Sequence, residues 1–117
     1  MKLIRREAET TAFETELRQW PTLVTSVIGV IELRRAAQRE LASSARVEAV
    51  LARLNAIELD AGIRETAATL EHPLRTLDAI HLATAISLED DLGAIACYDE
   101  RLANAARAEG IAVVSPL

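Results

Sequence analysis

The sequence predicts an open α/β fold with a short parallel sheet flanked by helices. Apolar runs of four or five residues alternate with helical segments along the 117 residues. Half of the residues are hydrophobic and only three are aromatic, a composition that suits closely packed aliphatic helices. Short, fully apolar strands between helices are typical of parallel sheets covered on both faces. A chain of this length without a linker or repeat predicts one domain over residues 1–117.

The first half of the chain predicts three helices and two strands. Pro21 closes the first helix, because the residue before a proline avoids the α region. Ser26 offers an N-cap for the second helix, and Ser43 or Ser44 offers one for the third. The predicted elements are a helix over 3–19, a strand over 22–26, helices over 27–41 and from Ser44 to about Asn55, and a strand over 56–60.

The second half continues the alternation of strands and helices. Asp60 and Asp99 each stand where an N-cap is expected, and Gly110 stands where a helix ends. The predicted elements are a helix from Asp60 to about Leu70, a helix after Pro73 that ends near Gly93, a strand over 94–98, a helix from Asp99 to Glu109 and a strand over 111–114.

Composition and charge limit the classes of partner that the protein is expected to bind. The formal net charge of −5 argues against a broadly basic surface that grips nucleic acid without specificity. Arginines bunch at Arg34, Arg35 and Arg39, however, so a local patch that contacts RNA or a protein partner is one interpretation of Arg34 and Arg35. The alternative is a solvated helix face with ion pairs. No apolar run approaches the roughly 20 residues of a membrane helix, so we expect no membrane association and a cytoplasmic protein.

Three acidic residues stand in or before helical segments. Asp78 shares a helix row with Leu82, and Glu32 lies among apolar neighbours. A buried carboxylate must be protonated, paired or bound to a metal ion, since burial without compensation costs roughly several kcal/mol. Each acid has a structural explanation: an ion pair with a nearby arginine for Glu32, the helix dipole after a Thr76 cap for Asp78, and an N-cap for Asp99.

Taken together, the acids indicate a metal site. In parallel sheets, ligands bind beyond the carboxyl ends of the strands, where Glu32, Asp78 and Asp99 are expected. Like charges in one site repel and are normally held by a hard divalent cation, Mg²⁺ or Mn²⁺. Such a cation serves phosphodiester hydrolysis. Thr25 or Ser26 is a candidate hydroxyl for a phosphate or a metal-bound water, with a helix cap as the alternative role.

Four segments carry a resemblance to a known family. They are Leu77–Ala85 (LDAIHLATA), Cys97–Leu102 (CYDERL), Val24–Ser26 and Val30–Arg34. In order and spacing the chain resembles the PIN-domain ribonucleases of the VapC toxin type. This resemblance implies a Mg²⁺- or Mn²⁺-dependent endoribonuclease toxin of a type II toxin–antitoxin pair, neutralised by a VapB-type antitoxin and forming a homodimer. It also implies that Glu32, Asp78 and Asp99 are catalytic, metal-binding acids and that Thr25 or Ser26 is an accessory group.

The start of the chain departs from the family pattern. The family begins with a central strand that ends in an acidic residue, whereas Met1–Leu3 resembles the segment after that strand. We therefore expect that the native protein starts upstream of Met1 and that this chain lacks the first strand. The alternative function is a catalytically inactive PIN relic that only binds the antitoxin, and an unrelated helical metal-binding domain is a third interpretation.

Overall fold

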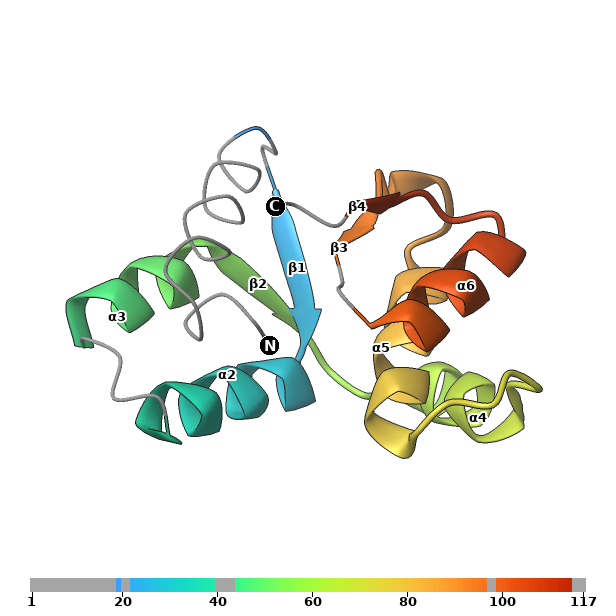
Figure 1. The fold of residues 1–117 in the computed structure, drawn as a ribbon, viewed down its shortest axis with the longest axis horizontal. Coiled ribbons are helices and arrows are strands. Elements are labelled where there is room, and N and C mark those ends of the chain that lie inside the picture. Colours follow the sequence, from blue (N-terminus) through green and yellow to red (C-terminus); the bar gives the residue numbers. More distant parts are fainter. Residues whose placement is uncertain (1–18, 20–21, 40–43, 97–98, 115–117) are drawn as a thin grey trace. The chain divides into compact units, whose positions relative to one another are not determined.

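The computed structural model describes residues 19, 22–39, 44–96 and 99–114. Contacts divide the chain into two compact units (Figure 1). The first unit holds the described residues up to Ile57, and the second unit holds those from Glu58 to Val114. Each unit has its own two-stranded parallel sheet. The predicted helix over 3–19 and the expected absence of a first strand fall outside the described residues, so both stay predictions.

The first unit pairs strand β1 (Leu23–Ser26) with strand β2 (Leu54–Ile57). The two strands run parallel, with Leu23 opposite Leu54 and Ser26 opposite Ile57, which confirms the predicted parallel order (Figure 1). The side-chain amide of Asn55 also donates a hydrogen bond of 3.1 Å to the Leu23 carbonyl. This cross-strand bond adds to the backbone pairing at the start of β1.

Two helices connect these strands. Helix α2 (Val27–Arg39) follows β1 directly, and helix α3 (Ser44–Arg53) leads into β2 without a loop. The buried residues of α2, mostly small, are Gly29, Leu33, Ala36 and Ala37. Because these side chains are small apart from Leu33, α2 approaches β1, β2 and α3 closely and contacts all three.

The second unit contains three helices and a second strand pair. Its elements in order are α4 (Ala61–Thr69), α5 (Thr76–Ser87), the 3₁₀ turn η1 (Glu89–Asp91), β3 (Ile95–Ala96), α6 (Glu100–Ala108) and β4 (Val113–Val114). Strands β3 and β4 are parallel, with Ile95 opposite Val113. Helix α5 contacts both α4 and α6, and its five buried residues are more than either of these helices has among the described residues.

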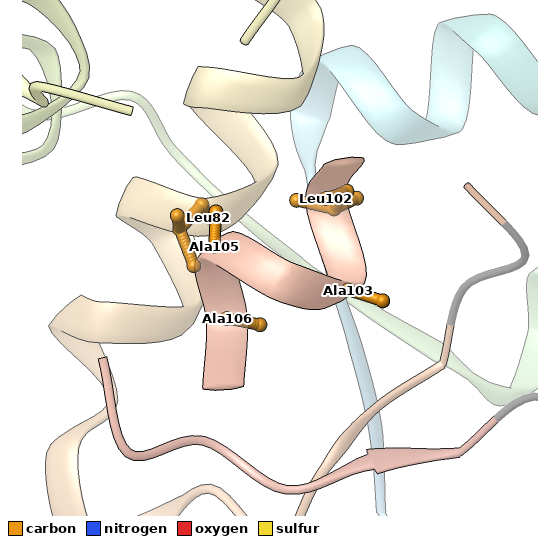
Figure 2. Close-up of a cluster of buried hydrophobic side chains, with 5 residues drawn as sticks. All are labelled: Leu82, Leu102, Ala103, Ala105 and Ala106. Atoms are coloured by element: carbon orange, nitrogen blue, oxygen red, sulfur yellow. The ribbon is translucent and has the colours of Figure 1, made fainter. Parts of the chain in front are cut away.

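A cluster of aliphatic side chains forms the core of the second unit. Figure 2 shows Leu82 of α5 beside Ala105 of α6, with Leu102, Ala103 and Ala106 from the same helix. Leu82 is fully buried. The alanines let α6 approach α5 closely, which places the large leucine side chains in the interface. The partly buried residues that surround this cluster are Leu70, Leu74, Ile86, Ile95, Ile111 and Val113.

Two predicted boundaries are wrong. Strand β2 covers Leu54–Ile57 and not residues 56–60, because its pairing with β1 fixes the register, and Asp60 already serves as a helix cap. Helix α5 ends at Ser87 and not near Gly93. The Ser87 hydroxyl donates to the Thr84 carbonyl (2.6 Å), and Glu89 adopts a left-handed φ of 48°, which an α-helix does not continue.

The other described elements agree with the prediction to within two residues, apart from the short strands β3 and β4. These strands cover Ile95–Ala96 and Val113–Val114, where the predicted runs are 94–98 and 111–114, and residues 97–98 lie outside the described part of the chain. Across the described part of the chain, no helix combines the length and the apolar character that crossing a membrane requires.

Candidate functional site

The predicted site residues divide between the two units. Those in the first unit are Thr25, Ser26, Glu32, Arg34 and Arg35. Those in the second unit are Asp78 and Asp99. Thr25 and Ser26 lie at the end of β1, and Glu32, Arg34 and Arg35 lie within α2. Asp78 lies in the first turn of α5, and Asp99 directly precedes α6.

Ser26 ends β1 and caps α2. Its hydroxyl oxygen accepts a hydrogen bond of 3.1 Å from the Gly29 backbone N–H, and the residue is only 1% exposed. The predicted N-cap is therefore confirmed, because this bond satisfies one of the unpaired N–H groups of the first helical turn. Thr25, the preceding residue, is half-buried. Of the two candidate hydroxyls, Thr25 is thus the more accessible one.

Glu32 lies in the second turn of α2 and is half-buried. Arg35 and Arg39, its predicted ion-pair partners, are both exposed. Within the described residues, neither arginine side chain forms a hydrogen bond or an ion pair. Among the described residues, the predicted ion pair of Glu32 with these two arginines is therefore not formed, although Glu32 does have an interaction of its own.

Asp78 is the third residue of α5 and is half-buried. The residue before the helix is Arg75, whose backbone is extended and whose side chain makes no capping hydrogen bond. Thr76 is therefore the first helical residue and not the predicted cap. A carboxylate in the first turn still gains from the helix dipole, by roughly 0.3–1 kcal/mol. Asp78 therefore gains stabilisation from the helix dipole although it does not cap α5.

Asp99 caps α6. Its carboxylate accepts a hydrogen bond of 3.0 Å from the Leu102 backbone N–H, which confirms the predicted N-cap. Asp60 has the same role in α4, where its carboxylate accepts from the Ile63 backbone N–H at 2.8 Å. Both aspartates are exposed. One capping bond uses one of about four acceptor positions on a carboxylate, so capping and metal binding are compatible.

The core of the second unit connects the two acidic helix starts. Asp78 lies four residues before Leu82, and Asp99 lies three residues before Leu102. Both leucines belong to the same cluster of buried side chains. Each carboxylate is therefore one helical turn away from a common packed core, which fixes the first turns of α5 and α6.

A further contact in this unit was not predicted. The His72 imidazole (Nε2) and the Glu109 carboxylate (Oε2) are 2.9 Å apart. The contact joins the segment before α5 to the residue that follows α6. No signal in the sequence could have indicated it, because the partners are 37 residues apart and neither belongs to a motif.

The donor chemistry of the three acids fits a hard divalent cation. Mg²⁺ and Mn²⁺ prefer oxygen ligands, which Glu32, Asp78 and Asp99 supply. Only Asp78 and Asp99 belong to the same unit. Of the residues that the structure describes, no group of three or more His, Cys, Asp or Glu is arranged to hold a metal ion. Glu32, Asp78 and Asp99 therefore stay predicted ligands, and two of them belong to the second unit.

Comparisons with known proteins identify the family. The PIN domain model matches residues 1–108. Ribonuclease VapC35 of Mycobacterium tuberculosis is 45% identical over 126 aligned residues, which span 99% of this chain and 90% of the relative. Ribonuclease VapC46 of the same organism is 38% identical, over 99% of this chain and 91% of the relative. No solved structure matches the chain.

These matches extend over nearly the whole chain and agree with the strand and helix order of both units. They confirm the predicted α/β fold class, with a short parallel sheet flanked by helices, and the resemblance to VapC-type ribonucleases. The chain belongs to the PIN-domain family.

Proposed function

We propose that the protein is an endoribonuclease toxin of a type II toxin–antitoxin pair, which hydrolyses phosphodiester bonds of RNA. The observation that carries this proposal is the 45% identity, along 99% of the chain, to a protein named as a VapC ribonuclease. The acidic residues at the starts of α5 and α6 support the same activity, since they lie on a shared core and offer oxygen ligands.

The proposed cofactor is Mg²⁺ or Mn²⁺, with Glu32, Asp78 and Asp99 as its ligands. When bound, such a cation polarises a phosphoryl oxygen and lowers the pKa of a bound water. The chain's own contribution is to hold the carboxylates in place. Asp99 is held by its bond to the Leu102 N–H, and Asp78 lies one helical turn before the fully buried Leu82 of α5. Thr25 is the better accessory hydroxyl, because Ser26 is buried and accepts the Gly29 N–H.

The proposed partners follow from the same family. We propose that a VapB-type antitoxin neutralises the protein, that the protein acts on RNA in the cytoplasm, and that it forms a homodimer. Arg34 and Arg35 are proposed contacts for RNA or the antitoxin, since both are exposed on α2. The single domain over residues 1–117 also stays a proposal.

The alternative that we propose is a catalytically inactive PIN protein that only binds the antitoxin. The two functions make opposite predictions about cleavage of RNA.

The deciding experiment is cleavage of total cellular RNA by the purified chain, with Mn²⁺ and with EDTA. The ribonuclease proposal predicts cleavage with Mn²⁺, none with EDTA and none by the Asp78→Asn variant. Asp60→Asn is the matched control, because Asp60 is also an acidic residue at a helix start but has no proposed ligand role. Binding of the antitoxin without any cleavage by the wild-type chain would support the inactive alternative.

A further inference from the structure

Helix α2 carries two arginines on the side of its axis where Glu32 lies. Each residue advances an α-helix by about 100° and about 1.5 Å. Arg35 therefore lies about 60° from Glu32 around the axis, and Arg39 lies about 20° from it. Arg34 is about 160° from Glu32, at the other margin of the exposed face. We call Glu32, Arg35 and Arg39 the α2 row.

The two arginines of the α2 row are exposed and lack a partner within the described residues. Two other arginines in the described part of the chain have a hydrogen-bond acceptor. Arg64 donates to the Leu59 carbonyl at 2.6 Å, and Arg107 donates to the Asn104 side chain at 3.3 Å. Because the full chain has a net charge of −5, the two neighbouring positive charges of the α2 row form a local basic site on an acidic protein. Such a row attracts an anionic ligand.

We propose that Arg35 and Arg39 bind the backbone phosphates of the RNA strand next to the bond that is cut. This inference rests on the proposed ribonuclease function, which places the reacting phosphate near Glu32. Arg35 lies about 4.5 Å and Arg39 about 10.5 Å further along the helix axis than Glu32. The two arginines therefore lie at increasing distances from Glu32 along the helix axis. Their guanidinium groups can bind phosphate oxygens through two parallel hydrogen bonds.

An acidic protein segment is the competing ligand for this surface. Such a partner needs an apolar anchor, and Ile31, 53% exposed and four residues before Arg35, is the available one. A single exposed isoleucine is common on protein surfaces, however, and does not form an apolar patch. On α2 the exposed surface around it is polar or charged, with Arg34, Arg35, Gln38 and Arg39. This surface therefore favours the RNA backbone over a protein anchor.

The test is the salt dependence of binding to a fluorescent single-stranded RNA oligonucleotide, measured by anisotropy in EDTA so that no strand is cut. Each phosphate contact contributes about 0.7 to the slope of log affinity against log salt for a single strand. Arg35→Gln and Arg39→Gln should each reduce the slope by about 0.7, and the double variant by about 1.4. Arg35→Lys should retain most of the slope, because a single charge still neutralises a phosphate.

One further variant makes the test specific. Arg107→Gln removes one exposed positive charge from α6 and should leave the slope at the wild-type value. Equal losses for Arg35→Gln and Arg107→Gln would mean that only net charge matters, and this would overturn the proposal.

Other outcomes would also overturn it. Failure of the wild-type chain to bind the oligonucleotide at low salt would do so. Displacement of the oligonucleotide by poly-glutamate from the wild-type chain, but not from a variant at Ile31, would also overturn the proposal. This result would identify an acidic protein segment as the ligand. RNA cleavage is measured in parallel, so that this inference can be separated from the proposed function. If the wild-type chain cleaves RNA but the arginine variants keep the wild-type salt slope, only the phosphate-binding role of the α2 row is refuted. Arginine-dependent slopes without cleavage refute the nuclease activity alone.

Discussion

Helices α5 and α6 both begin with an aspartate, but the two aspartates do different things. Asp99 precedes α6 and accepts the Leu102 N–H, so its carboxylate has a structural role in the helix start. Asp78 lies inside the first turn of α5, whose N-cap residue, Arg75, makes no side-chain capping bond. Asp99 is exposed, whereas Asp78 is half-buried. A capping role therefore explains the first aspartate, whereas the second lies in a first helical turn, where it gains from the helix dipole and has an interaction of its own.

Helix α4 provides an internal standard for this difference. Asp60 caps α4 with a bond of 2.8 Å to the Ile63 N–H, and no ligand role is proposed for it. Substitutions at Asp60 therefore measure what a cap alone contributes. A further effect at Asp99 or Asp78 on metal-dependent cleavage then reports on the proposed metal site.

The largest expected effect removes the support that both helix starts share. Leu82→Ala deletes a fully buried side chain from the core between α5 and α6, and it should lower the free energy of unfolding by about 2–5 kcal/mol. Urea unfolding measures this loss. Leu77→Ala, at a position 43% exposed on the same helix, should cost much less. Equal losses at the two positions would contradict the assigned core.

The second prediction concerns cleavage rates of the three aspartate variants. Asp78→Asn should reduce Mn²⁺-dependent RNA cleavage by about 100-fold or more, which is about 2.7 kcal/mol of transition-state stabilisation. Asp99→Asn should have a similar effect, because an amide is a poor ligand for a hard cation although it remains a good N-cap. Asp60→Asn should cleave at the wild-type rate. Cleavage by Asp99→Asn at the wild-type rate would mean that Asp99 serves only as a helix cap.

The third prediction uses metal binding without catalysis. A ligand that binds only the folded state stabilises it, by about 2.7 kcal/mol at a concentration about 100 times Kd. Mn²⁺ should therefore raise the melting temperature of the wild-type chain and of Asp60→Asn, and raise that of Asp78→Asn much less. Calorimetry across a Mn²⁺ titration gives the comparison. An equal rise in all three proteins would place the metal elsewhere.

The smallest effect is the contribution of the caps themselves. Asp60→Ala and Asp99→Ala should each lower the free energy of unfolding by about 1 kcal/mol, since each removes one capping bond. The corresponding asparagine variants should lose only a few tenths of that amount. Denaturant unfolding of all four variants is the measurement. A much larger cost for Asp99→Ala than for Asp60→Ala would reveal a second structural role for Asp99.

Much of the candidate site could be predicted because its signals are local. N-caps depend on a side chain and a backbone N–H three residues later, so Ser26, Asp60 and Asp99 were identified from short patterns. The Thr76 cap was wrong because a hydroxyl of the right type also fits inside a first turn. The position of Asp78 within that turn was nevertheless predicted, since an error of one residue at a helix start does not move the acid to another element.

The sequence by itself determined the alternation of strands and helices, the parallel order within each sheet and the positions of the three acids, because these depend on periodicity and chain order. Tertiary structure decided the extent of β2 and the composition of the core around Leu82. It also decided that His72 contacts Glu109. These features depend on which residues, far apart in the chain, come into contact, and no local pattern contains that information.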